Sequence, residues 1–304
     1  MDIDSLMNEE RATRFLAEKL GQGTVTLFLG AGTSRGASLP DWPELLRRMG
    51  CDVAAGSSAD VLQGLADDVK RDKCGGSERE FARLVKQQLY DGVSLSADLL
   101  RTDLLIALGA MLMGSRRGSV KRVMTFNFDS TLEWYVTLYG FIPRVILQPP
   151  ELEGAEDVRI YHPHGFLAHP ALGWRDSDFV ILGLRSVNAR LGTIGDPWWE
   201  LMRHTLRTSV GLFVGLSFRS FQDRSIAPLL ETVGKEVHNQ RPTGVWLCPL
   251  ESEEFSGPDK DKEKDRQTRA FLDSNVVPVF LPRFDDLPRF LLGICQEAAK
   301  AIRV

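Results

Sequence analysis

The chain has 304 residues, 43% of them hydrophobic and 26% charged, and a formal net charge of −4. This composition is typical of a globular protein, and the net charge excludes a chain-wide basic field for nucleic acid. The acidic, amphipathic N-terminus is not a signal peptide, and no apolar run approaches a membrane span. The four cysteines lie far apart, without a Cys-x-x-Cys pair. We therefore expect a reduced, cytoplasmic protein without a zinc ribbon or a disulfide framework.

Short apolar runs alternate with helical patterns along the chain. A helix is predicted over 10–20 and a strand, TVTLFL, over 24–29. Further helices are predicted over 42–49, 59–70, 78–91, 97–113, 129–139, 198–207, 224–237 and 285–302. Further strands are predicted over 121–126, 143–147, 157–161, 178–182, 210–216, 243–248 and 276–281. A charged surface loop is predicted over 252–266.

This alternation predicts an α/β fold with a doubly wound, mostly parallel, Rossmann-like sheet that helices cover on both faces. Residues 51–119 contain helical patterns and no strand, so we interpret them as a helical insertion into a main domain made of 1–50 and 120–304. Within the insertion, 104–113 is apolar almost all round its helix. Such a helix must be buried on every side. We expect a homo-oligomer interface to bury it; the alternative is burial between the insertion and the sheet.

The first predicted strand ends in small residues, which are Gly30, Ala31, Gly32, Thr33 and Ser34. A turn of this kind at the carboxyl edge of a parallel sheet lets the backbone approach a ligand, and its N–H groups can face a diphosphate. The spacing is not G-x-G-x-x-G, and the stretch has no Walker lysine. The same residues also suit a tight strand-to-helix turn that binds nothing.

Other predicted strands also end in polar or small residues. The stretch TFNFDSTLEW places Asn127 and Asp129 after one strand, and YHPHGF places His164 after another. The most hydrophobic strand, VGLFVGL, leads into Gly215 and Ser217. Because the carboxyl ends of parallel strands meet at one edge of a sheet, we expect these residues to share a site with the glycine stretch.

Together with Pro40-Asp41-Trp42, and in this order, these motifs resemble the sirtuin superfamily, most closely its bacterial sirtuin-like branch of NAD-consuming proteins. The resemblance covers about 25–300. Protein-deacylating sirtuins carry a four-cysteine zinc module after their catalytic His-Gly, whereas 166–209 contain no cysteine here. Those deacylases also read Pro-Asp-Phe-Arg where this chain reads Pro-Asp-Trp-Pro. The branch without zinc mostly resembles NAD glycohydrolases of antiviral defence, which deplete the NAD of infected cells.

The resemblance implies that NAD is the substrate, that no zinc is needed, and that nicotinamide and ADP-ribose are the products. Cleavage of the nicotinamide–ribose bond passes through an oxocarbenium-like state. His164 would be the general base, because an imidazole titrates near neutral pH. Asn127 would hold the ribose hydroxyl and the water. Asp129 would contact the nicotinamide carboxamide or the loop around it, and Asp41 would orient the glycine loop. The remaining expected contacts are Gly30, Ala31, Gly32, Thr33 and Ser34 to the diphosphate, and Gly215 and Ser217 to the adenosine ribose.

Structural roles are the alternatives for several of these residues. His162 and His169 flank the expected base, and either could replace it on position alone. Asn127 and Asp129 could form a turn and a helix N-cap. We expect Asp223 to cap the helix predicted over 224–237, with no catalytic role.

The leading expectation is an NAD glycohydrolase that acts in prokaryotic anti-phage defence. One alternative is an NAD-dependent protein deacylase or ADP-ribosyltransferase. Another is a non-catalytic sensor or assembly subunit that binds NAD or ADP-ribose. The resemblance also implies a separately encoded partner, such as an ATPase, a helicase or a nucleic-acid-guided module, and no membrane partner.

Overall fold

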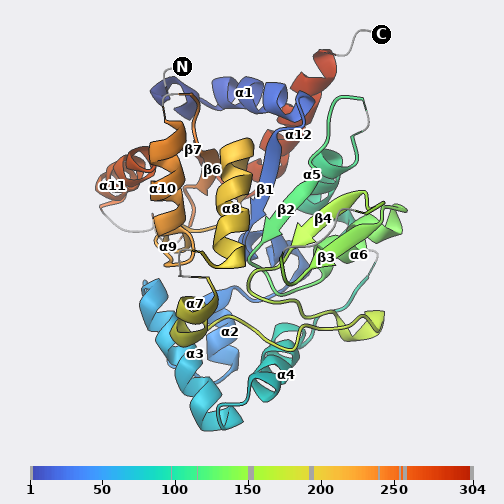
Figure 1. The fold of residues 1–304 in the computed structure, drawn as a ribbon, viewed down its shortest axis with the longest axis vertical. Coiled ribbons are helices and arrows are strands. Elements are labelled where there is room, and N and C mark those ends of the chain that lie inside the picture. Colours follow the sequence, from blue (N-terminus) through green and yellow to red (C-terminus); the bar gives the residue numbers. More distant parts are fainter. Residues whose placement is uncertain are drawn as a thin grey trace.

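A parallel sheet forms the centre of the molecule (Figure 1). The computed structural model describes residues 3–96, 98–114, 116–149, 154–191, 195–238, 240–252, 255 and 259–301. Within them, one seven-stranded sheet has the order β3-β4-β2-β1-β5-β6-β7, and every pairing is parallel. The strands are β1 (Val25–Leu29), β2 (Arg122–Thr125), β3 (Pro143–Ile146), β4 (Val158–Tyr161), β5 (Val210–Val214), β6 (Gly244–Pro249) and β7 (Val276–Leu281).

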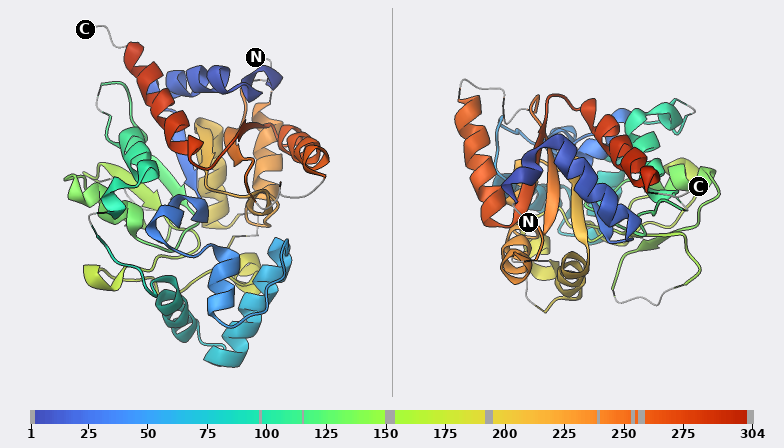
Figure 2. Two further views of the ribbon diagram at one scale, coloured as in Figure 1. Left: turned by 180° about the vertical axis from the view of Figure 1, so that it is seen from behind. Right: turned by 90° about the horizontal axis from the view of Figure 1, so that it is seen from above.

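Helices cover both faces of this sheet (Figure 2), so the predicted doubly wound, Rossmann-like fold is confirmed. The helices are α1 (Glu9–Gly21), α2 (Trp42–Arg48), α3 (Ala59–Cys74), α4 (Glu78–Leu89), α5 (Asp103–Leu112), α6 (Thr131–Leu138), α7 (Leu184–Arg190), α8 (Pro197–Thr208), α9 (Phe218–Phe221), α10 (Ala227–Val237), α11 (Lys260–Asp273) and α12 (Asp286–Lys300). Short 3₁₀ helices are η1 (Asp4–Met7), η2 (Ala31–Ala37), η3 (Leu99–Arg101) and η4 (Pro170–Leu172). No helix among the described residues is long and apolar enough to cross a membrane.

The two faces of the sheet carry separate apolar cores, because successive side chains of a strand point to opposite faces. On β1, Leu27 and Leu29 pack with residues of α1, α5, α6 and α12. Phe28 points the other way, stacks on Phe213 with ring centroids 4.7 Å apart, and packs with residues of α8 and α10. All five residues of β1 and all five of β5 are buried, which the continuous apolar runs predicted.

A third apolar core lies beyond the carboxyl ends of the central strands. There α2, α3, α4 and α7 pack against one another and form a helical module below the sheet in Figure 1. The apolar side of α3 supplies Leu62, Ala66 and Val69 to this core. The module therefore faces the loops that follow β1, β2 and β5.

Helix α5 belongs to the helical layer on one face of the sheet and not to this module. Its apolar side chains pack with α1, α12 and the sheet, so one chain buries the helix without a second subunit. The alternative expectation, burial within one chain, thus accounts for most of this helix, and the homo-oligomer stays a prediction. We propose that the insertion proper consists of α3 and α4.

Two further predictions were wrong. Residues 178–182 form no strand; Val180 and Leu182 are buried in the core of the helical module instead, and the N–H of Ile181 donates to the carbonyl of His164. The segment is apolar because it is covered on two sides, not because it pairs with a strand. The charged stretch 252–266 becomes helical from Lys260, where i,i+3 pairs such as Arg266–Glu263 stabilise an exposed helix. Part of that stretch lies outside the described residues.

The position of α5 yields a prediction about stability. Leu108 is 1% exposed and Ile106 is 40% exposed on the same helix. We expect Leu108→Glu to lower the free energy of unfolding by several kcal/mol, because it buries an unpaired carboxylate. Ile106→Glu, the matched control, should change it by about 0.5 kcal/mol or less. Urea denaturation measures both values. A folded Leu108→Glu chain that sediments as a smaller species than its parent would contradict this result and restore the interface.

Candidate functional site

Two adjoining cavities lie at the carboxyl ends of β1, β2 and β5. The first has a volume of about 110 Å³ and lies between the sheet edge and the helical module. The second has a volume of about 230 Å³ and lies beside the ends of β5 and β6. Ala31, Asp41, Trp42 and Ser220 line both cavities, so the two form one cleft. Because β1 is the point where the strand order reverses, this is the position at which open α/β sheets bind ligands.

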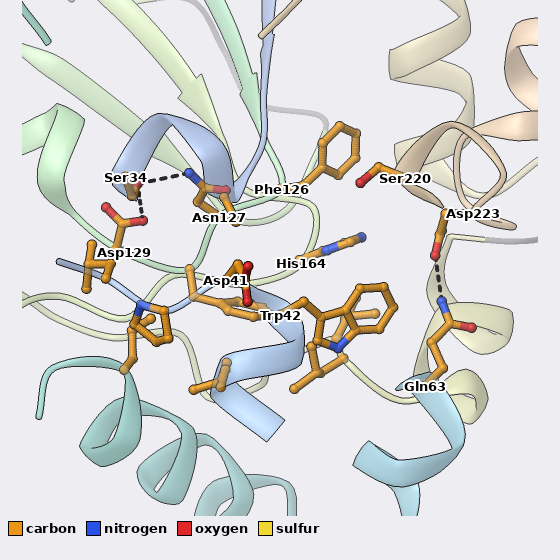
Figure 3. A pocket seen from close by; sticks show the side chains of 18 of the residues that line it. Ser34, Asp41, Trp42, Gln63, Phe126, Asn127, Asp129, His164, Ser220 and Asp223 are labelled. Carbon is orange, nitrogen blue, oxygen red and sulfur yellow. Dashed lines mark hydrogen bonds between the residues drawn. The ribbon is translucent and has the colours of Figure 1, made fainter. Parts of the chain in front are cut away.

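Asn127 is held in the first cavity by its side-chain amide. Its Nδ2 lies 3.1 Å from the carbonyl oxygen of Gly30, from Oγ1 of Thr33 and from Oγ of Ser34. Since the carbonyl of Gly30 can only accept, the amide nitrogen must face the glycine stretch. The oxygen Oδ1 has no donor among the residues that the structure describes. The amide therefore offers the cavity an acceptor, while its donors serve the loop (Figure 3).

The glycines of the first motif are needed for packing between two loops. A Cβ on Gly30 would lie 2.6 Å from the carbonyl oxygen of Gly215, and one on Gly215 would lie 2.6 Å from the backbone nitrogen of Thr33. Gly215 also has a φ of +70°, which side-chain-bearing residues rarely adopt. The N–H of Gly32 donates to the carbonyl of Gly215. The two turns thus touch backbone to backbone, and Gly30 lines neither cavity of the cleft.

The hydroxyl groups that we expected at the diphosphate are used inside the protein. Thr33 Oγ1 donates to the carbonyl of Gly30 at 2.7 Å, and Ser34 Oγ donates to Asp129 Oδ2 at 2.8 Å. The other oxygen of Asp129 accepts from the N–H of Thr131 at 3.0 Å. Asp129 is therefore a bridge between the glycine stretch and the start of α6. The residue is 7% exposed, and both of its carboxylate oxygens bond within the protein.

His164 is the histidine that lines the first cavity among the described residues. Its ring lies edge-on to Phe126, with centroids 5.2 Å apart, and its Nε2 is buried without a partner in the described structure. Burial lowers the pKa of His164 from 6.5 to about 4, against the opposing effects of the Asp223 carboxylate and of a hydrogen bond to the Phe126 backbone. The imidazole is consequently neutral at physiological pH.

The two neighbouring histidines have structural partners. His162 is 0% exposed and contacts the carboxylate of Glu133 and the carbonyl of Asn127. His169 caps η4 and contacts the carbonyl of Val93. Neither lines the cleft, so the position of His164 agrees with the role that the family resemblance implied.

Asp223 is a site residue that the sequence did not reveal. It does not cap α10, which begins at Ala227 after the N-cap residue Ile226. Its carboxylate accepts a hydrogen bond from Gln63 Nε2 at 2.6 Å and from the N–H of Ser225 at 2.8 Å. It lines the first cavity on the side facing His164 (Figure 3). An acidic residue shortly after the strand-end serine was its only signal in the sequence.

Gln63 belongs to α3, so the helical module supplies one wall of the cleft. A second contact, between Arg224 and Asp60 at 3.0 Å, joins the same two elements at the surface. These bonds hold the module against the loop after β5. No pattern in the sequence linked residues so far apart.

Gly32, which we expected at the diphosphate, and Gly215 and Ser217, which we expected at the adenosine ribose, all line the second cavity. Ser217 also caps α9 by accepting from the N–H of Ser220. Arg35 and Arg219 line this cavity as well, and the guanidinium of Arg35 lies 5.1 Å from the centre of the Phe284 ring. Such cations suit a diphosphate, and the sequence analysis missed them.

Asp41 and Trp42 lie where the two cavities join. The carboxylate of Asp41 caps α2 through the N–H of Glu44 at 3.0 Å, so its role in the structure is to begin that helix. Trp42 Nε1 is buried and has no partner within the described ranges.

Most of the residues expected at the site line the cleft. They are Asn127, His164, Ser34, Asp129, Asp41, Ala31, Gly32, Gly215 and Ser217. Gly30 and Thr33 line neither cavity. No group of three or more His, Cys, Asp or Glu residues among those described could hold a metal ion.

The low pKa of His164 yields a prediction about pH. Between the folded pKa of about 4 and the unfolded value near 6.5, the unfolded chain binds the additional proton. Acidification from pH 7 to pH 5 should therefore lower the free energy of unfolding, with a contribution of about 1–3 kcal/mol from this residue. His164→Gln cannot titrate and should lose correspondingly less. Urea denaturation of both chains at the two pH values measures the difference, and equal losses would contradict the low pKa.

Comparisons with known proteins identify the family of this chain. A family model described as the SIR2-like domain matches residues 121–276. No curated protein matches the chain. A solved structure described as "Structural Basis for the Mechanism and Regulation of Sir2 Enzymes" has 14% sequence identity and a TM-score of 0.48, covering 95% of this chain and 97% of that chain. The family match includes β2 to β6, Asn127, His164 and Asp223, and spans more than half of the residues. The chain therefore belongs to the SIR2-like family, a family of NAD-using proteins.

Proposed function

We propose that this protein hydrolyses NAD to nicotinamide and ADP-ribose. The observation that carries the proposal is the meeting of Asn127 and His164 in one cavity beside the glycine stretch. The nicotinamide ribose would occupy this first cavity. The diphosphate and adenosine would extend past Ala31 into the second cavity, where Arg35 and Arg219 lie.

Unpaired polar atoms support a ligand in this cleft. Four buried side-chain atoms of its lining residues lack a partner in the described structure: Trp42 Nε1, Gln63 Oε1, His164 Nε2 and Ser252 Oγ. Buried polar groups are nearly always hydrogen-bonded, and an unpaired one costs about 1–3 kcal/mol. Their concentration along one cleft is the pattern that a polar ligand or ordered water would satisfy.

The chemistry follows from the groups at the first cavity. The bond between ribose C1′ and the pyridinium nitrogen breaks, nicotinamide leaves as a neutral molecule, and an oxocarbenium-like sugar remains. Oδ1 of Asn127 accepts a hydrogen bond from a ribose hydroxyl or from the attacking water. Water adds to C1′ and gives its proton to His164, whose lone pair is available because the ring is neutral. The carboxylate of Asp223 stabilises the imidazolium that forms.

The wider biological role rests on the resemblance to the zinc-free branch of the superfamily. We propose an effector of prokaryotic anti-phage defence that depletes NAD, and that acts with a separately encoded ATPase, helicase or nucleic-acid-guided partner. Expression of the chain with and without phage infection, followed by measurement of cellular NAD, tests this role. Unchanged NAD in infected cells that carry the complete defence locus would contradict it.

Replacement of the two central residues tests the reaction. We expect Asn127→Ala and His164→Ala each to lower NAD turnover by about 10²- to 10⁴-fold, because each removes a group that acts on the reacting ribose or water. NAD should still bind, because the second cavity is intact. His238→Ala changes an exposed histidine whose ring contacts the Lys235 carbonyl, and this control should keep full activity. Chromatography of the products and calorimetric NAD binding provide the measurements.

The products also separate the alternatives. Nicotinamide with free ADP-ribose supports the hydrolase, whereas NAD loss only in the presence of an acylated peptide supports a deacylase. Labelled protein supports an ADP-ribosyltransferase. Saturable NAD binding without turnover supports a sensor. A folded variant with near-parental hydrolysis would remove its residue from the proposed mechanism.

A second experiment concerns metal. Because 166–209 lack the cysteines of the zinc module, we expect neither folding nor NAD cleavage to require zinc. Treatment with a strong chelator should leave the melting temperature and the turnover unchanged. Loss of either, with recovery on addition of zinc, would show that a zinc site exists.

A further inference from the structure

The buried pair His162–Glu133 makes direct contact with the backbone of Asn127. We propose that this pair is a positioning device: it holds residue 127 so that its Oδ1 faces the cavity. The two residues come from different elements, because His162 directly follows β4 and Glu133 lies in the first turn of α6. This inference rests on the proposed function, in which Asn127 positions the ribose or the water.

The contacts account for nearly all the hydrogen-bonding groups of Asn127. His162 Nδ1 lies 3.0 Å from its carbonyl oxygen, and its backbone N–H donates to Thr125 Oγ1 at 3.2 Å. Its side-chain Nδ2 faces the glycine stretch, as described above. Among the described residues, Oδ1 alone is left for a ligand. The residue is thus held at its backbone by His162 and at its side chain by the glycine stretch.

The protons of the pair can be counted from the geometry. Because the carbonyl of Asn127 only accepts, Nδ1 of His162 must carry a hydrogen. Nε2 lies 2.7 Å from Glu133 Oε1, so one more proton lies between these two atoms, on either the imidazole or the carboxyl group. In both cases the pair has no net charge. This is the state that complete burial allows, since His162 is 0% and Glu133 1% exposed.

If the pair were purely structural, apolar side chains could replace it without loss of activity. If it positions Asn127, the same replacement should lower activity. Buried ion pairs can often be exchanged for hydrophobic residues of similar volume at little cost in stability. Phe at 162 would extend the existing ring contact with Phe166, whose centroid is 4.9 Å away. The exchange would nevertheless leave the carbonyl of Asn127 without its donor.

The decisive variant is therefore His162→Phe combined with Glu133→Leu. We expect it to fold with a melting temperature within a few degrees of the parent, while kcat falls by about 10- to 100-fold and KM for NAD changes by less than about threefold. Glu133→Gln should keep kcat within about threefold of the parent, because its amide can donate to Nε2 of His162. Arg203→Met with Glu236→Leu removes a pair between α8 and α10 that lies outside the cleft. This control should keep the parental kcat.

A folded double variant with parental kcat would overturn the proposal, as would a Glu133→Gln chain that folds but loses activity to the same extent as the double variant. If the double variant does not fold, His162→Gln decides. One amide nitrogen cannot reach both the Glu133 carboxylate and the Asn127 carbonyl as the two ring nitrogens do, so kcat should fall while KM holds. A folded His162→Gln chain with parental kcat would contradict the positioning role.

A readout without substrate separates this inference from the proposed function. Hydrogen exchange of the Asn127 side-chain amide, followed by NMR, should be at least about 10-fold faster in the double variant than in the parent, because loss of the backbone contact loosens the residue. A parental chain that does not cleave NAD would refute the proposed function. Equal exchange in both chains would refute the positioning role, whatever the reaction.

Discussion

The side-chain amide of Asn127 joins the loop after β2 to the glycine stretch after β1, and the geometry of the cleft depends on this connection. A single nitrogen contacts a carbonyl and two hydroxyl groups, and each of those hydroxyls is bonded further within the loops. The glycine stretch in turn contacts Gly215 after β5 backbone to backbone. Three strand ends thus form one hydrogen-bonded unit. The polar groups are satisfied internally, so a ligand meets a rigid wall rather than a set of free side chains.

This unit changes the meaning of several motif residues. Thr33, Ser34 and Asp129 have the chemistry of ligand-binding groups, but their hydrogen bonds are made to the protein. The groups left for a substrate in the first cavity are Oδ1 of Asn127 and Nε2 of His164. A motif residue can therefore matter to a site by building it, without touching the ligand. The role proposed for His162 and Glu133 is of the same kind, because these buried residues would act on the site by holding Asn127.

The helical module completes the cleft from the opposite side. Gln63 donates to Asp223 at one side of the first cavity, and Trp42 lines both cavities. Burial lowers the pKa of His164, and the Asp223 carboxylate limits this shift by stabilising the protonated ring. The acid–base behaviour of the histidine therefore depends on a residue from another loop.

The sequence alone determined the sheet, because apolar runs such as 210–214 must be covered on both faces, and it placed Asn127 and His164 at strand ends by the order of motifs. The family resemblance favoured His164, but position alone could not separate it from His162. The two residues lie two positions apart after the same strand, and only packing shows which ring meets a cavity and which meets Glu133. An apolar pattern indicates that a segment is buried but not which elements bury it. The sequence therefore could not show that α1, α12 and the sheet cover α5, or that 180–182 are buried without forming a strand. The roles of Asp223 and Gln63 were decided by the tertiary structure alone, since their hydrogen bond joins residues 160 positions apart.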